Sequence, residues 1–295
     1  MESTNKKLPN YSIWNIEKYS PESFNAIADD EEKLLYLVSI GHLAPSTHNT
    51  QPWKFKIKPQ EYSISIYLDP LLVLPISDIK ARQAIISVGC AIANIEIAAK
   101  YLTGIENIEF NNIKDLTLPT DQHLLIATIY ISRNWNPFFE FKLLFNAIFE
   151  RRTIRGEMNA EAKIDESILA NILKACTEEV TTIFINDWDR KSALAELQGM
   201  ADSFVINNKK FCDELIQGWI IENDSLCGLG MPGDTFYLND QQTKAIKDKS
   251  KKGHDYEAYE ITEIINLGKR GILNSNVVGM ILVDEDNPNN WVKGG

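Results

Sequence analysis

The chain has 295 residues, of which 44% are hydrophobic and 24% are charged, as in a soluble globular protein with a sizeable core. Its formal net charge is −11, so there is no overall basic field to hold nucleic acid or an anionic membrane surface. We therefore expect no nucleic-acid or membrane partner, and any site for an anion must be local.

Cysteine usage and the first residues indicate the compartment. The cysteines are Cys90, Cys176, Cys212 and Cys227. They form no C-x-x-C pair and have no histidine at zinc-finger spacing, so we expect reduced, mostly buried thiols and no metal site. The first residues, MESTNKKLPNYSIW, contain no apolar signal region. The most apolar run, residues 84–99, is short for a membrane span. The sequence therefore predicts a cytoplasmic protein.

Apolar periodicity predicts a first set of elements. In chain order they are a helix over residues 31–43, strands over 53–57 and 62–68, a long apolar helix over 84–103 and a buried strand over 124–131. Pro45 should end the first helix and Gly104 the second.

A second set follows in the remainder of the chain. It comprises helices over residues 141–150 and 164–176, a strand over 181–186, helical structure over 191–222, a loop or mobile cover over 228–253 and a strand over 276–284. Asp165 is a candidate N-cap for the helix over 164–176.

The two sets resemble each other. FNAI occurs at residues 24–27 and again at 145–148, and in both places a helix and then a strand follow. A repeat of this length favours two fused domain halves over a solenoid. The predicted fold class is α+β, with a first half over residues 1–138 and a second half over residues 139–295.

The segment APSTHNTQPWKF at residues 44–55 is dense in short polar side chains between two prolines. Ser, Thr, Asn and Gln offer hydrogen-bond donors and acceptors without charge, which suits a flat heterocycle with ring carbonyl and N–H groups. On composition alone, a local turn explains the same residues. Of the two histidines here, His48 is a candidate to face a ligand, whereas His42 is expected to be packed or exposed.

The segment ERRTIRGE at residues 150–157 places three arginines within five positions of an acidic protein. Guanidinium groups bind phosphate oxygens bidentately, so Arg151, Arg152 and Arg155, with the hydroxyl of Thr153, form a candidate phosphate clamp. A solvated charged turn is the alternative.

Two other patterns are set aside. CGLGMPGD at residues 227–234 has G-x-G-x-x-G spacing, but it lacks the strand before it and the helix after it that a dinucleotide fingerprint requires. The basic run at residues 244–254 is interrupted by Asp248 and has no aromatic residue, so it is interpreted as a solvated loop.

The segment at 44–55 resembles the P-S-[ST]-x-N-x-Q-P-W-x-F signature of the nitroreductase family of flavoproteins. The matching residues are Pro45, Ser46, Thr47, Asn49, Gln51, Pro52, Trp53 and Phe55. RRTIR resembles the R-x-[ST]-x-[KR] phosphate motif of that family, and residues 89–106 resemble its long central helix. The resemblance implies that Pro45, Ser46, Thr47, Asn49 and Gln51 line the ring and ribityl side of FMN, while Arg151, Arg152, Thr153 and Arg155 hold its phosphate.

The order of the motifs is unusual for that family, because the arginine motif follows the polar motif. Ordinary members form dimers in which both chains contribute to each flavin site. This chain is similar to the fused, mycobacterial Acg-type branch, in which one polypeptide imitates the dimer. The resemblance therefore implies a monomer that acts as a pseudo-dimer with one FMN site. The C-terminal NNWVKGG resembles the start of a second long helix, so the second half is expected to be truncated.

The implied activity is that of an FMN-dependent NAD(P)H oxidoreductase: hydride passes to flavin N5 and electrons then pass to a small-molecule acceptor. The flavin carries this chemistry, so no catalytic residue is predicted. The alternative is a non-catalytic protein of the same fold that binds or sequesters FMN, which a closed cover formed by residues 228–253 would favour.

Overall fold

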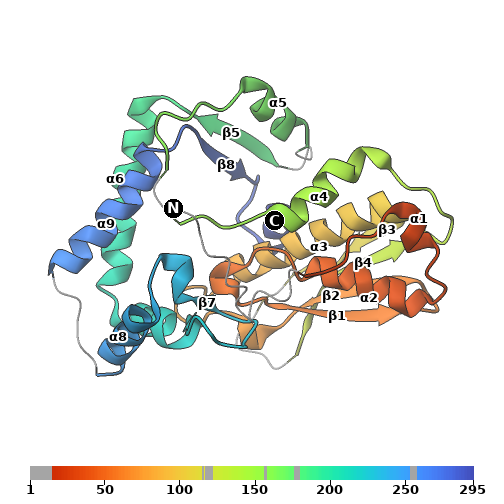
Figure 1. The fold of residues 1–295 in the computed structure, drawn as a ribbon, viewed down its shortest axis with the longest axis horizontal. Coiled ribbons are helices and arrows are strands. Elements are labelled where there is room, and N and C mark those ends of the chain that lie inside the picture. Colours follow the sequence, from red (N-terminus) through yellow and green to blue (C-terminus); the bar gives the residue numbers. More distant parts are fainter. Residues whose placement is uncertain (1–14, 115, 117–121, 156–157, 176–179, 253–257) are drawn as a thin grey trace.

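The fold combines helices with three separate sheets, which confirms the predicted α+β class (Figure 1). The computed structural model describes residues 15–114, 116, 122–155, 158–175, 180–252 and 258–295. Cys176 and the N-terminal residues 1–14 lie outside the described residues. Of the other cysteines, Cys90 and Cys212 are half-buried but Cys227 is exposed, so the expectation of mostly buried thiols is wrong for Cys227.

A four-stranded antiparallel sheet organises the first part of the chain. Its strands are β1 (Trp53–Lys58), β2 (Ser63–Leu68), β3 (Ile105–Phe110) and β4 (Leu124–Ile131), in the order β1-β2-β4-β3. The strands predicted over 53–57, 62–68 and 124–131 are confirmed. Sequence reasoning missed β3, because only Ile105 and Ile108 of this edge strand turn toward the core while its other residues are exposed.

The central helix α3 (Arg82–Leu102) packs against this sheet and against α1 (Pro21–Asn25), α2 (Asp30–Gly41) and α4 (Lys142–Glu150). The predicted helices over 31–43, 84–103 and 141–150 correspond to α2, α3 and α4. α3 has the length and hydropathy of a membrane span, but 61% of its most apolar 18-residue window is buried inside the fold. Its apolar surface is therefore used for the core.

Asp78 provides the N-terminal cap of α3, because Ala81 at the cap position has no side-chain acceptor. Its two carboxylate oxygens accept hydrogen bonds from Gln83 N at 3.0 Å and Ala84 N at 2.9 Å. Burial raises the pKa of Asp78, and the bonds to the backbone N–H groups oppose that rise.

The short helix α10 (Pro288–Lys293) lies across α3 at Gly89. A Cβ at Gly89 would clash with the carbonyl oxygen of Val292, so only glycine allows this backbone approach. Trp291 is buried beside it and donates from Nε1 to Asp286 Oδ1 at 2.8 Å. The last residues of the chain therefore complete the core of the first part.

The second part begins with α5 (Glu166–Ala175), which is followed by the antiparallel ribbon of β5 (Thr181–Ile185) and β8 (Val278–Leu282). Asp165 caps α5 as predicted, since its Oδ1 accepts from Ser167 N at 2.7 Å. The predicted strands over 181–186 and 276–284 are confirmed.

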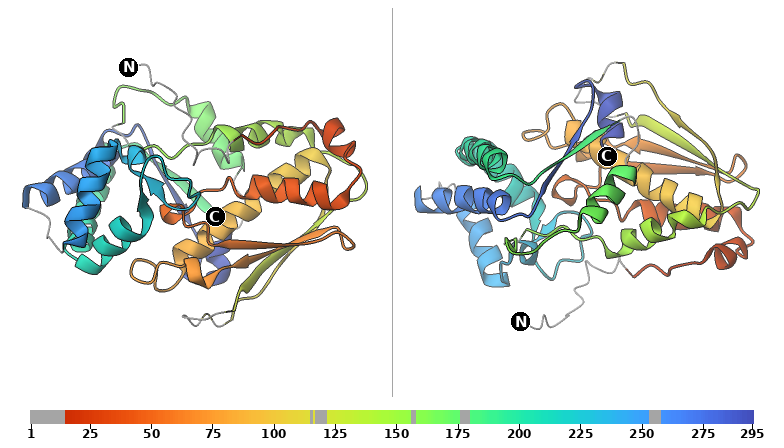
Figure 2. Two further views of the ribbon diagram at one scale, coloured as in Figure 1. Left: turned by 60° about the horizontal axis from the view of Figure 1, so that its bottom comes forward. Right: turned by 90° about the horizontal axis from the view of Figure 1, so that it is seen from above.

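A helical insertion separates β5 from β8 (Figures 1 and 2). Its elements are α6 (Trp188–Ile206), α7 (Lys209–Asp213), a π-helical turn (Glu214–Trp219), the two-residue strands β6 (Ile220–Ile221) and β7 (Met231–Pro232), a 3-10 turn (Gly233–Phe236), α8 (Asp240–Lys251) and α9 (Ala258–Leu273). The helix predicted over 191–222 is in fact broken after α6, where Asn208 caps α7.

The loop predicted over residues 228–253 is wrong for its second half, which is α8. Asn239 and Gln242 form a capping box at the start of this helix, with Gln242 N donating to Asn239 Oδ1 at 2.9 Å. The run from Lys244 to Lys252 was predicted as a loop because it is highly charged, but it lies at the end of α8, which exposes most of these charges to solvent.

The insertion is anchored to the first part of the chain by Glu214. Its carboxylate accepts hydrogen bonds from Ile76 N at 2.8 Å, Ser77 N at 2.9 Å and Ser77 Oγ at 2.6 Å. These bonds fix the insertion beside the polar segment identified in the sequence.

Candidate functional site

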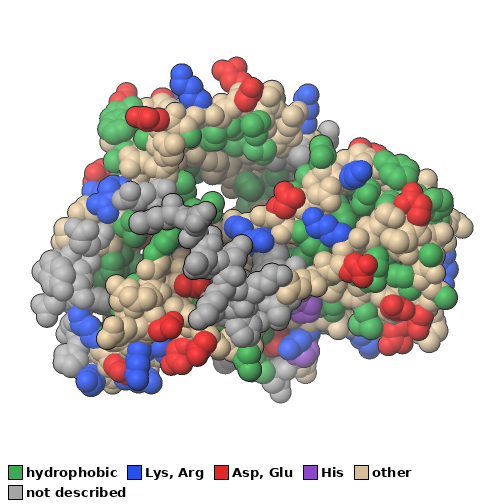
Figure 3. All heavy atoms as spheres, viewed as in Figure 1, with side chains coloured by type: hydrophobic (Ala, Val, Ile, Leu, Met, Phe, Trp, Pro, Cys, Tyr) green, Lys and Arg blue, Asp and Glu red, His purple; other side chains and the backbone are tan. Residues whose placement is uncertain are grey.

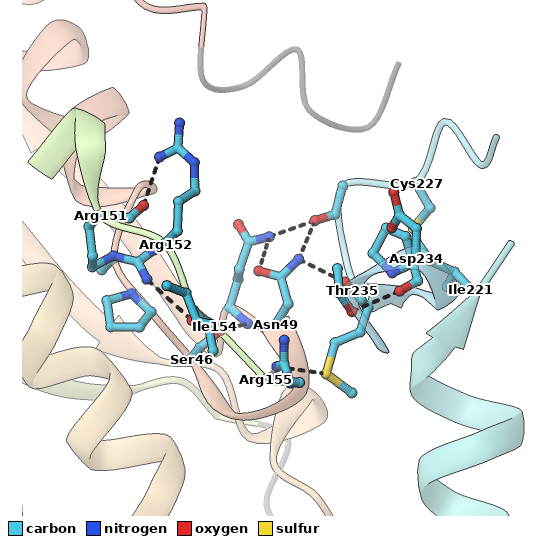
Figure 4. Close-up of a pocket in the computed structure, with 18 of the residues that line it drawn as sticks. Ser46, Asn49, Arg151, Arg152, Ile154, Arg155, Ile221, Cys227, Asp234 and Thr235 are labelled. Carbon is cyan, nitrogen blue, oxygen red and sulfur yellow. Dashed lines mark hydrogen bonds between the residues drawn. The ribbon is translucent and has the colours of Figure 1, made fainter. Parts of the chain in front are cut away.

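A cavity of about 340 Å³ lies where three segments meet: the polar loop (residues 45–52), the arginine segment (residues 151–155) and the cover segment (residues 227–237). Its lining includes Pro45, Ser46, Asn49 and Gln51 from the polar loop, all five residues of the arginine segment, and Cys227, Gly228, Gly230, Met231, Pro232, Asp234, Thr235 and Tyr237 from the cover segment (Figure 4). The two motifs singled out in the sequence therefore share one cavity.

The polar loop has a constrained backbone. His48, Asn49 and Gln51 have positive φ angles of 52°, 54° and 49°. Such angles are unfavourable for residues other than glycine, although asparagine tolerates them best. Ser46 stabilises the conformation, because its Oγ accepts from Gln51 N at 3.0 Å and its carbonyl accepts from Asn49 N at 3.0 Å.

The side-chain amides of Asn49 and Gln51 bind the cover segment. Asn49 Nδ2 donates to the carbonyls of Gly228 at 3.0 Å and Gly230 at 2.9 Å, and Gln51 Nε2 donates to Gly228 at 2.7 Å. Gly230 N donates in return to the carbonyl of Asn49 at 3.2 Å. These amides therefore do more than form a turn: they hold a distant segment across the cavity (Figure 4).

The remaining residues of the loop have other surroundings. Thr47 is not among the lining residues; its N–H donates to Ser87 Oγ of α3 at 3.4 Å. His48, the candidate to face a ligand, is not among the lining residues; His42 packs against Phe55, which is one of its two expected surroundings, and also lines the cavity. Trp53 Nε1 donates to His42 Nδ1 at 3.1 Å, and burial lowers the pKa of His42, so the imidazole at the cavity wall is neutral near pH 7.

Arg151 joins the arginine segment to the polar side. Its Nη2 donates to the carbonyl of Leu43 at 3.2 Å, just before the polar loop, and its Nη1 donates to Thr153 Oγ1 at 3.4 Å. Burial lowers the pKa of the Arg151 guanidinium, and the neighbouring Arg152 lowers it further. An arginine nevertheless stays protonated near neutral pH, so the cavity contains a partly desolvated cation.

The other two arginines point in different directions. Arg152 Nη1 donates to the carbonyls of Phe149 at 3.0 Å and Arg151 at 2.7 Å, so it caps the C-terminus of α4 and turns away from Asn49 in Figure 4. Arg155 lies over the ring of Phe236 at 4.9 Å and donates to Met231 Sδ at 3.3 Å. Arg155 therefore contacts the cover segment, and the three guanidinium groups do not converge on one point.

The sequence suggested residues 228–253 as a possible cover, and the structure brings the first part of that range, together with Cys227, into the lining of the cavity. Gly228 and Gly230 do not form a dinucleotide fingerprint, because β6 ends at Ile221 and α8 begins only at Asp240. Gly230 has a φ of +88°, and a Cβ there would meet the carbonyl oxygen of Trp219 at 2.9 Å. Gly230 is the residue in the sequence that could have indicated this contact, because a glycine permits a close approach of two backbones.

Charges of both signs are interspersed on the face of the molecule drawn in Figure 3. Asp234 lines the cavity together with the arginines. Within the described part of the chain, no group of three or more His, Cys, Asp or Glu side chains is arranged to hold a metal ion. The groups that line the cavity include amides, hydroxyls and guanidinium groups together with the carboxylate of Asp234.

Replacing both Asn49 and Gln51 by leucine should release the cover segment without unfolding the protein. The carbonyls of Gly228 and Gly230 would lose three donors, so hydrogen exchange measured by mass spectrometry should rise over residues 227–237. Each bond contributes about 1 kcal/mol, which predicts a rise in exchange of more than tenfold. A Thr47→Val variant serves as the control, because the Thr47 side chain does not line the cavity. Unchanged exchange in the double variant would contradict this role.

Comparison with known proteins gives a local similarity. No family model matches the chain. Two curated proteins of Mycobacterium tuberculosis, "Putative NAD(P)H nitroreductase MT3217" of strain CDC 1551 / Oshkosh and "Putative NAD(P)H nitroreductase Rv3131" of strain ATCC 25618 / H37Rv, are each 29% identical to this chain over 83 residues. The match covers 28% of this chain and 24% of each relative. It supports a distant relationship to nitroreductase-type oxidoreductases.

Proposed function

We propose that the protein is an FMN-dependent NAD(P)H oxidoreductase of the nitroreductase type, acting on a small-molecule electron acceptor. The observation that carries the proposal is the shared cavity, where uncharged groups of Ser46, Asn49 and Gln51 lie opposite the arginine segment. The distant similarity to proteins named as NAD(P)H nitroreductases supports the same class of reaction.

The residues present fit FMN by their chemistry. Amide and hydroxyl groups can exchange hydrogen bonds with the carbonyl and N–H groups of a neutral ring. The partly desolvated Arg151, with Thr153 beside it, is suited to the phosphate, because a buried cation gains most from an anionic partner. Arg155 would join them once its contact with Met231 is exchanged for the phosphate.

A bound FMN supplies the redox chemistry, with hydride from NAD(P)H delivered to its N5 and electrons then passed to the acceptor. The protein's own residues bind and orient. The polar loop would position the ring through its fixed backbone, Arg151, Thr153 and Arg155 would hold the anionic end, and the cover segment would exclude water. We assign no catalytic residue; His42 is neutral and already accepts from Trp53.

We also propose that one chain forms one complete flavin site as an intramolecular pseudo-dimer. Two observations support this. The polar loop and the arginine segment come from the proposed halves 1–138 and 139–295. The order helix, strand, strand, helix occurs twice, as α2-β1-β2-α3 and as α5-β5-β8-α10, and each strand pair is antiparallel. We also place the protein in the cytoplasm, in keeping with the free thiols of Cys90, Cys212 and Cys227.

The cover segment favours a second candidate function, in which the protein binds and sequesters FMN without turnover. The four hydrogen bonds between the polar loop and Gly228 or Gly230 hold this segment across the cavity. A cover that stayed closed over bound flavin would exclude the nicotinamide.

Anaerobic stopped-flow mixing with NADPH and, separately, with NADH separates the two functions. Protein purified with FMN, or reconstituted with it, should lose the visible absorbance of oxidised flavin within seconds if it is an enzyme. Stable absorbance over minutes with both nucleotides would support sequestration. Failure to retain any flavin after reconstitution would exclude both functions.

A further inference from the structure

Helix α6 has a row of exposed apolar side chains, which we call the α6 seam. Leu197, Met200 and Phe204 are 61%, 69% and 77% exposed, and Ala193 is exposed one turn earlier. At about 3.6 residues per turn these four positions lie on one side of the helix. Their spacing of four, three and four residues is that of a seam along which two helices pair.

Among the described residues, α6 packs through the side of the helix opposite the seam. The buried residues Lys191, Ala195 and Gly199 lie on the opposite side of the helix, which packs against α9. At Gly199 a Cβ would meet the side chains of Ile265 and Lys269, so the two helices approach closely there. The pair formed by α6 and α9 stands at one end of the molecule (Figures 1 and 2).

We propose that the α6 seam binds the α6 seam of a second copy of this chain, with the two helices antiparallel. The side-chain sizes support this arrangement. Ala193 and Phe204 are equally distant from a point between Gln198 and Gly199, and so are Leu197 and Met200. A two-fold axis through that point places the smallest residue opposite the largest and Leu197 opposite Met200, so that the seam is complementary to itself.

Charge selects the antiparallel direction. Asp187 and Asp189 lie at the N-terminus of α6, where Asp187 pairs with Arg190 at 3.6 Å, and Lys209 and Lys210 follow the C-terminus. Antiparallel pairing brings the exposed Asp189 of one copy toward the basic end of the other, whereas parallel pairing would bring the lysines of the two copies together. Lys209 already pairs with Asp213 at 2.9 Å, so we assign the contact with Asp189 of the second copy to Lys210.

A groove beside the seam also combines apolar and charged side chains. It is lined by Met200, Phe204 and Ile265, by Lys209 and Lys210, and by Lys269, which pairs with Glu196 at 2.7 Å. This apolar floor, with Lys210 at its rim, can receive Asp189 of the second copy. None of the seam residues lines the proposed flavin cavity, so the association is independent of the proposed function. It departs from the monomer that the sequence predicts.

The first test of the proposed association is the molecular mass of the protein in solution. Sedimentation equilibrium over a dilution series should show a reversible dimer. A variant with both Leu197→Glu and Phe204→Glu should be monomeric at every concentration, because four charges would enter each paired seam. Leu226→Glu, at a position that is 82% exposed in the cover segment region, should dimerise normally. Circular dichroism confirms that each variant is folded. A monomeric parent protein, or a dimer that persists in the double variant, would overturn the proposal.

The direction is tested by disulfide trapping in a background with Cys176→Ser and Cys227→Ser; Cys227 is the exposed thiol among the described cysteines. Oxidation of a mixture of Leu197→Cys chains and Met200→Cys chains should yield the cross-linked heterodimer. Phe204→Cys chains alone should not cross-link with each other, since antiparallel pairing separates these positions. A strong cross-link between two Phe204→Cys chains would show a parallel pair instead and contradict the inference.

The charge contact is tested by exchange. Asp189→Lys and Lys210→Glu should each weaken dimerisation by up to about tenfold, since each dimer contains two such exposed pairs. The two changes combined in one chain should restore it, because position 189 then again meets an opposite charge. If the two changes together weaken dimerisation by the sum of their separate effects, Asp189 and Lys210 do not contact each other across the dimer.

Discussion

Replacing Arg151 and Arg155 together by alanine should abolish flavin retention. Hydrogen bonds to charged groups contribute about 1.5–3 kcal/mol each, so the loss of two guanidinium groups should weaken FMN binding by more than about a hundredfold. Binding is measured by the quenching of flavin fluorescence and by the flavin absorbance that survives gel filtration. Arg151→Lys alone should retain part of the affinity, because it keeps the charge but loses the planar fork.

Arg152→Ala is the matched control for this prediction. Arg152 lies between the other two in sequence, but its guanidinium donates to the carbonyls of Phe149 and Arg151 at the end of α4. Its loss should lower the thermal midpoint slightly and leave FMN affinity within a few-fold of the parent protein. If Arg152→Ala releases the flavin and the double variant retains it, the phosphate is held in a different way from that proposed. Because Arg151 also binds the Leu43 carbonyl, circular dichroism of the double variant must show an intact fold.

Gly89→Ala should be among the most destabilising single-methyl changes in the chain. The new Cβ would collide with the Val292 carbonyl and lie 3.1 Å from Gly295 Cα, and both neighbours are backbone atoms that cannot rotate away. Overpacking of this kind costs about 1–3 kcal/mol of the free energy of unfolding, and Gly89→Leu should cost more. Urea denaturation followed by far-ultraviolet circular dichroism measures the loss.

Gly271→Ala provides the control, because it also lies in a helix but has nothing within 4 Å of the added Cβ. It should leave stability unchanged or raise it by up to about 1 kcal/mol. Hydrogen exchange over residues 288–293, measured by mass spectrometry, can show whether Gly89→Ala unfolds the whole protein or only detaches α10 from α3. Equal stability of the two alanine variants would refute the close contact between these helices.

The sequence was most informative where one local pattern determines the structure. The strands at Trp53–Lys58 and Leu124–Ile131 and the helix α3 follow from apolar periodicity, and the cap of α5 follows from Asp165. The edge strand β3 and the helix α8 were missed, because exposure and charge conceal their periodicity. The break after α6 was missed because Asn207 was not recognised as the C-cap of α6, nor Asn208 as the N-cap of α7.

The candidate site was predictable in its composition but not in its connections. The polar loop and the arginine segment could be identified from residue types, and the structure brings them into one cavity. The direction of Arg152 and the place of His42 depend on tertiary packing, which one segment of sequence does not encode. The bonds from Asn49 to Gly228 and Gly230 join residues 179 and 181 positions apart, beyond the reach of any local pattern.

Those distant bonds also set an order for biosynthesis. The polar loop is translated early, but the carbonyls that close it belong to residues made far later. A nascent chain that has reached only the arginine segment would expose an open, unfinished pocket to solvent. Contacts of such high contact order form slowly, so completion of the pocket should be a late folding event and the stage at which the growing protein depends most on chaperones.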